Sequence, residues 1–164
     1  MAESFEPITG TSVTLRPLRR EDVDIEHAFV SGLSADTRSN RLLGGARAIT
    51  RDYIESLVNV DYSRDMAIAA TTMLDGEKLI GVARYLRAGN DAEFAIVIAD
   101  TWQGRGIGKR LLGKLVDVGR RRGVQRLYGH VLATNRPMLE LVRKLGFRLE
   151  RHEDPTLTRA TLDL

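Results

Sequence analysis

The stretch that decides the fold is AEFAIVIADTWQGRGIGKRLLGKLVDVGRRRG, from Ala92 to Gly123. It opens with an unbroken apolar run, Phe94–Ala99, which is typical of a strand buried on both faces. Alternate glycines then leave little side-chain bulk, so that a ligand can approach the backbone closely. From Ile107 onward, apolar residues recur at helical spacing. The stretch therefore predicts a buried strand, a glycine-rich turn and a long amphipathic helix.

The turn and the helix that follows it predict an anion site. The first N–H groups of a helix have no partner within the helix, and the helix dipole is positive at that end. Basic side chains of the same segment add charge, namely Arg105, Lys109 and Arg110. We therefore expect a phosphate or pyrophosphate on the backbone amides from Gln103 to Lys109.

Two familiar phosphate-binding loops do not fit this spacing. A nucleoside triphosphate loop would continue Gly108-Lys109 with serine or threonine, and Arg110 stands there instead. The dinucleotide pattern G-x-G-x-x-G would need its third glycine one residue after Gly108. The turn therefore belongs to neither class.

The turn resembles instead the acyl-CoA-binding motif of the GNAT N-acetyltransferases, Gln/Arg-x-x-Gly-x-Gly/Ala. Every position of the motif is matched, by Gln103, Gly104, Arg105, Gly106, Ile107 and Gly108. Two later segments, Asn135–Met138 and Lys144–Phe147, also resemble that family. The resemblance implies the α/β (α+β) GNAT fold, a mixed central β-sheet of about seven strands flanked by about five helices. It also implies acetyl-CoA as the acyl donor and a primary amine as the acceptor.

The order of elements along the chain agrees with that fold. Besides the central strand, strands are predicted at residues 12–18, 66–73, 78–87, 126–132, 147–151 and 157–163. Helices are predicted at residues 19–33, 34–43, 50–58, from 107 onward and at 136–145. Ser34 is a candidate N-cap for the second of them. The composition, 43% hydrophobic and 29% charged, suits one globular domain with a core. We expect a single domain over residues 1–164.

Composition also excludes several classes of protein. The chain has no cysteine, which excludes disulfides, thiolate zinc sites and cysteine nucleophiles. Its three histidines are too scattered to predict a metal site, so no metal is expected. The N-terminal segment MAESFEPITG lacks the pattern of a signal peptide, and no apolar run reaches membrane-spanning length. A cytoplasmic protein without a membrane partner is expected.

The basic residues need a separate explanation. The formal net charge is +3, and the positive residues concentrate between Arg105 and Arg126. Nucleic-acid binding would explain such a cluster and would weaken steeply with salt, without depending on CoA. However, the cluster is not interleaved with aromatic residues of the kind that bind single strands. A CoA pocket explains the charges more simply, and no nucleic-acid partner is expected.

The first half of the chain carries a sharper resemblance. Val13–Leu18, Leu33–Arg38 and Asp61–Ala67 resemble the acetyltransferase domain of Pat-type bacterial protein lysine acetyltransferases. Those enzymes acetylate, and thereby switch off, acyl-CoA synthetases such as acetyl-CoA synthetase. In that group the catalytic domain is usually fused to a larger regulatory or synthetase-like domain. We expect none here, and this departure leaves the acceptor open.

Amide formation needs a neutral amine, whereas a lysine with a pKa of about 10 is protonated near neutral pH. The resemblance implies that Glu93, on the central strand, takes the proton directly or through a water. Its place at the start of an apolar strand predicts partial burial, which would raise its pKa towards a useful value. The alternative is a solvated Glu93, or one paired with Arg84 or Arg87. Asp91 and Asp100, at the two ends of the same strand, are weaker candidates for the base, because turn and capping roles account for both.

The resemblance also implies the remaining cofactor contacts. Backbone N–H groups of Ile96, Val97 and Ile98 would bind the thioester oxygen and the pantetheine arm. Asn135 would contact the cofactor, or cap the late helix, or do both. The tyrosine that often protonates the CoA thiolate is replaced by Val142. Since thiols have pKa values of about 8.5, the CoA thiolate can leave without an acid or with water as the acid. Tyr128 and His130 are near enough in sequence to be considered as alternative acids.

Three functions remain open at this point. The leading one is acetyl transfer to a protein lysine, and the second is acetyl transfer to a small amine such as an amino acid, a polyamine or a drug. The third is a non-catalytic acyl-CoA-binding module, against which Glu93 argues and for which Val142 argues weakly. The resemblance implies that residues 33–62 build the acceptor pocket. The polar candidates there are Arg38, Arg41, Arg47, Asp52, Tyr53, Glu55, Asp61 and Tyr62. Members of the family that this chain resembles are often homodimers, although the sequence shows no interface signature.

Overall fold

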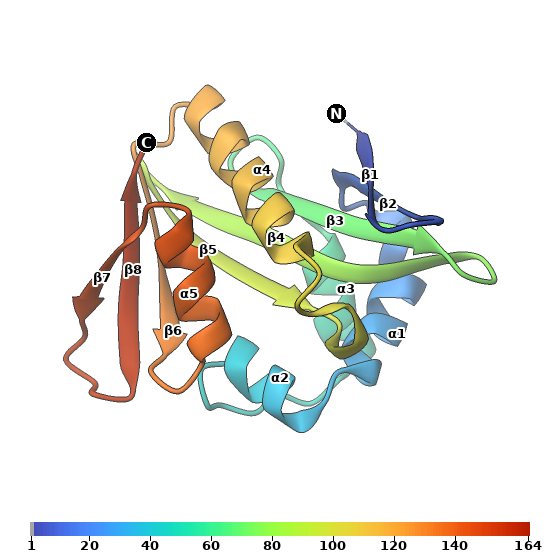
Figure 1. Cartoon of the computed structure of the whole chain (residues 1–164), viewed down its shortest axis with the longest axis horizontal. Coiled ribbons are helices and arrows are strands. Elements are labelled where there is room, and N and C mark those ends of the chain that lie inside the picture. Colours follow the sequence, from blue (N-terminus) through green and yellow to red (C-terminus); the bar gives the residue numbers. More distant parts are fainter. Residues whose placement is uncertain (1) are drawn as a thin grey trace.

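The computed structural model describes residues 2–164 as one mixed sheet with helices on both faces (Figure 1). The strands are β1 (Glu3–Ile8), β2 (Thr11–Pro17), β3 (Met66–Met73), β4 (Glu77–Ala88), β5 (Asp91–Ile98), β6 (Arg126–Leu132), β7 (Arg148–Arg151) and β8 (Leu157–Asp163). The helices are α1 (Val23–Gly32), α2 (Ala35–Arg41), α3 (Arg51–Val58), α4 (Ile107–Arg121) and α5 (Arg136–Lys144). Two short 3-10 turns are η1 (Arg20–Asp22) and η2 (Asp100–Trp102). This architecture confirms the predicted α+β fold with a mixed central sheet and five helices.

The strands lie in the order β1-β2-β3-β4-β5-β6-β8-β7. Neighbours are antiparallel except β5 and β6, which run parallel. The sequence predicts about seven strands, and the eighth in the described chain is β1. Because β1 lies at the edge of the sheet and none of its residues is buried, its segment lacks the apolar alternation that marks a strand.

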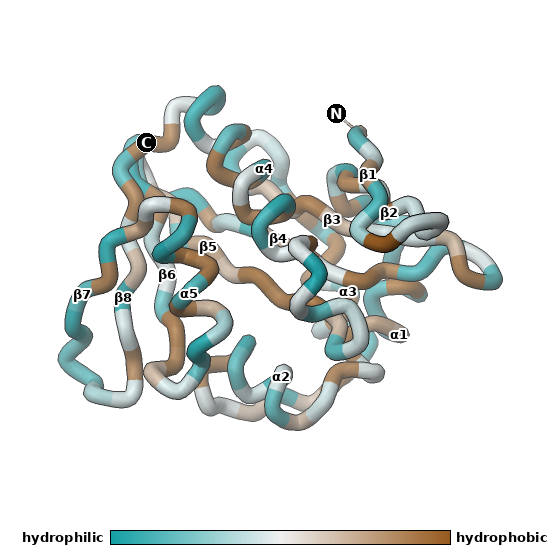
Figure 2. Tube along the Cα trace, in the orientation of Figure 1, coloured by the Kyte–Doolittle hydropathy of each residue, from teal (hydrophilic) through white to brown (hydrophobic). Residues whose placement is uncertain are grey.

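Each face of the sheet has its own hydrophobic core. On one face, α4 packs Leu111, Leu112 and Leu115 against alternate residues of β3 to β5. On the other face, α1 and α3 contribute Phe29 and Val58. Figure 2 shows hydrophobic residues along the central strands, whereas α2 and β7 are largely hydrophilic. Among residues 2–164, no helix is both long and apolar enough to cross a membrane.

The helix predicted at residues 19–33 begins later than expected. Residues 20–22 form η1, and α1 starts only at Val23. The carboxylate of Asp22 accepts the N–H of Arg19 at 2.7 Å and forms an ion pair with Arg16 at 2.8 Å. These contacts hold the chain in a tight turn before the helix begins.

The parallel strands β5 and β6 separate soon after they meet. They pair only from Asp91 to Glu93 on β5, with Arg126 to Tyr128 on β6. Beyond that point the ring of Phe94 lies where a side chain of β6 would otherwise project, because a Cβ added to Gly129 would lie 2.6 Å from it. The divergence leaves one edge of β5 without a strand partner.

Candidate active site

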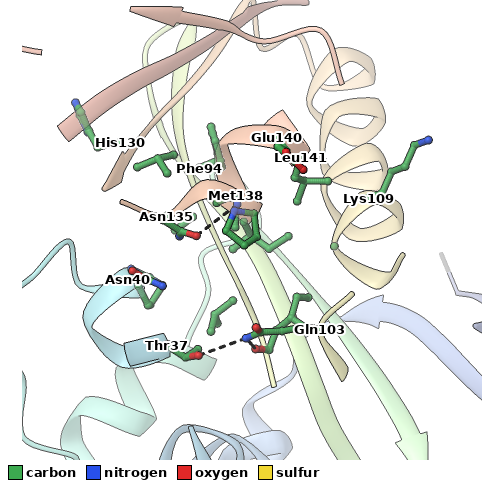
Figure 3. Close-up of a pocket in the computed structure, with 18 of the residues that line it drawn as sticks. Thr37, Asn40, Phe94, Gln103, Lys109, His130, Asn135, Met138, Glu140 and Leu141 are labelled. Atoms are coloured by element: carbon green, nitrogen blue, oxygen red, sulfur yellow. Dashed lines mark hydrogen bonds between the residues drawn. The ribbon is translucent and has the colours of Figure 1, made fainter. Parts of the chain in front are cut away.

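A cavity of about 670 Å³ opens where β5 and β6 diverge (Figure 3). It is lined by β5, β6, α5, the start of α4 and the glycine-rich turn, which we define as residues 103–109, and also by α2. The predicted site residues that line it are Glu93, Ile96, Val97, Ile98, Gln103, Gly104, Gly106, Gly108, Lys109 and Asn135. The fold therefore gathers most of the predicted site at one opening.

The ladder between β4 and β5 decides which amides of β5 are free. Ala99 donates its N–H to the carbonyl of Ile80, so alternate residues, including Val97, pair with β4. The N–H groups of Ile96 and Ile98 point the other way, into the gap beside β6. Of the three predicted donors, Ile96 and Ile98 can thus bind a ligand, while the backbone of Val97 is engaged in the sheet.

The glycine-rich turn presents a row of free N–H groups. Within residues 2–164, none of the amides from Gly104 to Lys109 donates a hydrogen bond to a protein group. The N–H of Gln103, the first amide of the predicted row, is not free, because it donates to the carbonyl of Asp100 at 3.3 Å. Gly104 and Gly106 have φ values of 75° and 82°, in the left-handed region that glycine tolerates. At Gly108, a Cβ would lie 3.2 Å from Leu141, so α4 begins close against α5. Six consecutive free amides at a helix N-terminus are thus available to an anion, as the prediction requires.

Two residues of the motif do not bring their side chains to the cavity. The guanidinium of Arg105 lies 5.3 Å from the centre of the Trp102 ring, a cation–π contact. The side chain of Ile107, the first residue of α4, is buried in the hydrophobic core between this helix and the sheet. Their backbone amides still belong to the free row, so their expected contribution is through the main chain.

The carboxylate of Asp100 ties α2 to this end of β5. It accepts the N–H of Ser34 at 2.9 Å, the hydroxyl of Ser34 at 2.8 Å and the hydroxyl of Thr37 at 2.5 Å. The hydrogen bond from Thr37, with help from Ser34, lowers the pKa of Asp100 below its ordinary value. Gln103 also reaches Thr37, at 3.3 Å (Figure 3). The turn and α2 are therefore joined by one hydrogen-bond network around the Asp100 carboxylate and the Thr37 hydroxyl, which we call the Asp100 node.

Glu93 is more exposed than the sequence leads us to expect. Its side chain is 47% accessible, because it lies at the mouth of the gap on the face of the sheet opposite α5. Glu93 is therefore less buried than expected. The alternative arginine partners are also engaged elsewhere, since Arg84 lies near Glu26 and Arg87 donates to backbone carbonyls. The partner of Glu93 is His130, whose Nδ1 is 3.3 Å from Oε2.

The late helix provides a cap but no acid. The side chain of Asn135 accepts the N–H of Met138 at 3.4 Å and lines the cavity, so both roles predicted for it are compatible (Figure 3). Val142 is buried in the core, away from the cavity. Tyr128 does not line the cavity either, and Arg159 stacks on its ring at 4.6 Å. His130 does line it.

The predicted acceptor region, residues 33–62, includes α2, but most of the α2 residues that line the cavity were not singled out. Thr37, Asn40 and Arg41 line the cavity, but among the polar residues considered for the acceptor side only Arg41 was named. The other candidates there, Arg38, Arg47, Asp52, Tyr53, Glu55, Asp61 and Tyr62, do not line it. The one signal in the sequence was Ser34 as an N-cap, and its hydroxyl does accept the N–H of Thr37.

The basic side chains of α4 and of Arg122, which follows its last residue, are largely engaged within the protein. The guanidinium of Arg122 donates to the carbonyls of Asp65 and Tyr62. Lys114 pairs with Glu3, and Arg110 stacks on Phe5 at 4.4 Å. Within the described chain, no three histidine or acidic side chains are grouped so as to hold a metal ion.

Comparisons with known proteins agree with this geometry. The model of the acetyltransferase (GNAT) family matches residues 48–147. An acetyltransferase from Pseudomonas aeruginosa is 37% identical over 148 residues, which cover 88% of this chain and 80% of that protein. The acetyltransferase Pat from Mycolicibacterium smegmatis is 34% identical over 141 residues, 84% of this chain but only 42% of that protein. Among solved structures, the GNAT domain of S. lividans PAT matches with a TM-score of 0.89 at 23% identity, over 99% of this chain and 97% of that chain.

Proposed function

Because the chain belongs to the GNAT family and is an acetyl-CoA-dependent N-acetyltransferase, we propose that its acceptor is a protein lysine, of the acyl-CoA synthetase type. The observation that carries this proposal is the similarity to Pat. The match leaves out fewer residues of this chain than the segment from α1 to α3 contains. At least part of that segment, which lies on the acceptor side, is therefore matched by Pat. The chain spans less than half the length of Pat, so the activity of the whole of Pat enters here only as part of the proposal.

In the proposed complex, acetyl-CoA enters along the free edge of β5. The pyrophosphate lies on the amides from Gly104 to Lys109, with Lys109 beside it. The pantetheine arm and the thioester oxygen bind the N–H groups of Ile96 and Ile98, which point into the gap. These donors are fixed by the sheet, so no reorganisation is needed when negative charge develops on the oxygen.

The acceptor amine approaches from the opposite face of the sheet, where Glu93 and α2 line the opening. An ammonium group must first lose a proton, because its nitrogen has no lone pair to attack the thioester. We assign this function to the carboxylate of Glu93, acting directly or through a bridging group. The neutral nitrogen then bonds to the acetyl carbon, and the carbon–sulfur bond breaks.

The leaving thiolate does not depend on a tyrosine in this proposal. Val142 occupies that position and is buried. A thiol has a pKa of about 8.5, so the thiolate is a reasonable leaving group near neutral pH. The second proton of the amine can therefore reach the sulfur through water after the bond has broken.

A panel of acceptors tests the proposal. Release of CoA thiol from acetyl-CoA is measured with purified acetyl-CoA synthetase and, separately, with amino acids, polyamines and other small amines. Turnover on the synthetase, with acetyl-lysine identified by mass spectrometry, is the expected result. Turnover only on a small amine would replace the lysine by a small-molecule acceptor. Tight binding of acetyl-CoA without turnover on any amine would favour a non-catalytic acyl-CoA-binding module.

A further inference from the structure

Glu93 and His130 are brought together at the opening of the cavity by two strands that have begun to diverge. Glu93 lies beside Tyr128 at the last position where β5 and β6 pair, and His130 is two residues further along β6. Side chains two apart on a strand share a face, so Glu93 and His130 both point to the acceptor side. The imidazole is 20% accessible and lines the cavity.

The chemistry of this contact decides which nitrogen carries the hydrogen. A carboxylate offers only lone pairs, so Nδ1 of His130 is the donor to Oε2 of Glu93, across 3.3 Å. The lone pair of a neutral imidazole is then on Nε2. Among residues 2–164, no group forms a hydrogen bond with that nitrogen. A carboxylate on one nitrogen and a free lone pair on the other is the arrangement of a carboxylate–imidazole base.

The other groups around His130 leave Glu93 as its charged partner. Tyr128 and His152 approach with ring centroids at 6.2 and 4.9 Å, both edge to face. Nδ1 of His152 accepts the N–H of Asp154, so a neutral His152 carries its hydrogen on Nε2. Arg159 of β8 is opposite His130 in the strand register, but its guanidinium stacks on the ring of Tyr128.

We propose that His130 is a catalytic residue that receives the amine proton at Nε2, with Glu93 orienting the ring and stabilising the imidazolium. This inference rests on the proposed function and identifies the bridging group through which Glu93 acts. An ammonium and a neutral imidazole become a neutral amine and an imidazolium. The amine nitrogen then bonds to the acetyl carbon as the carbon–sulfur bond breaks, its second proton goes to the CoA sulfur, and the imidazolium returns its proton to solvent.

The test compares pH profiles of acetyl transfer, between about pH 5.5 and 9, on the best acceptor of the panel. The proteins are the wild type, His130→Gln, His130→Ala with and without added imidazole, and His27→Gln as a matched control on the exposed face of α1. Binding of acetyl-CoA is measured for each, because a correctly folded variant retains it.

The expected result is a loss of about 10²-fold in kcat for His130→Gln, with KM little changed and the acid limb of the profile removed. Added imidazole should restore part of the rate of His130→Ala, which a merely structural role would not allow. His27→Gln should match the wild type. If His130→Gln keeps the wild-type kcat and acid limb, the inference fails while the proposed function stands. If the wild type acetylates no acceptor, both fail together.

Discussion

The hydroxyl of Thr37 donates a hydrogen bond of 2.5 Å to the carboxylate of Asp100, and so joins α2 to the end of β5. Helix α2 has no buried residue of its own, yet it forms one wall of the cavity. Its position therefore depends on polar contacts rather than on apolar packing. Because Gln103 of the glycine-rich turn reaches the same hydroxyl, the cofactor side and the acceptor side share this node.

Replacing Asp100 by asparagine should loosen that wall. The amide cannot accept all the hydrogen bonds that Ser34 and Thr37 donate to the carboxylate, so amide exchange in residues 35–41 should accelerate. KM for the acceptor should rise by roughly fivefold, while affinity for acetyl-CoA changes less. Asp36→Asn, in the first turn of the same helix, is the control. Equal effects of the two substitutions would show that the node is not what positions α2.

The same contact makes a prediction about pH. Hydrogen bonding lowers the pKa of Asp100, so its stabilising contribution is fully present above the ordinary aspartate value of about 4 and is lost as pH falls through the lower folded value. Protection of α2 amides, corrected for intrinsic exchange, should thus be unaffected by this group between about pH 8 and 5. A loss of protection already near pH 6 in the wild type, absent in Asp100→Asn, would contradict this.

The glycine-rich turn gives a matched pair of substitutions. Gly106 has a φ of 82°, where alanine is strained by about 1 kcal/mol, so Gly106→Ala should destabilise the chain and distort the row of amides. Gly113 lies inside α4 with nothing within 4 Å of an added Cβ, so Gly113→Ala should stabilise by about 0.5–1 kcal/mol. Thermal unfolding and calorimetric binding of CoA measure both.

Only Gly106→Ala is expected to weaken CoA binding, by about tenfold or more. If both variants bind CoA as the wild type does, the conformation of the turn does not determine the anion site. If Gly113→Ala alone weakens binding, the site lies further along α4 than the free amides indicate.

The local pattern from Phe94 to Ile107 predicted the strand, the turn and the helix, because each depends on neighbours in sequence. The free amides of Ile96 and Ile98 could not be separated from that of Val97, since the choice depends on the register with β4. The contact between Glu93 and His130 likewise depends on where two strands stop pairing. These features arise from long-range pairing, which no local pattern contains.

Most of the wall formed by α2 was not singled out for a related reason. Apart from Ala35, its residues are polar, and all are exposed or half-buried, so they have no apolar periodicity facing the sheet. The contact of Thr37 with Asp100 joins residues 63 positions apart. Ser34 predicted the start of the helix correctly, but a helix cap says nothing about what the helix covers. The edge strand β1 was missed because it buries no residue.

The most direct test of the account is acetyl transfer by Glu93→Gln beside Asp91→Asn, which makes the matching change on the same strand outside the cavity. The account predicts that Glu93→Gln binds acetyl-CoA as the wild type does but transfers the acetyl group at least about 10²-fold more slowly. Asp91→Asn should keep the wild-type rate. Transfer by Glu93→Gln at the wild-type rate would contradict the assignment of this carboxylate to the removal of the amine proton.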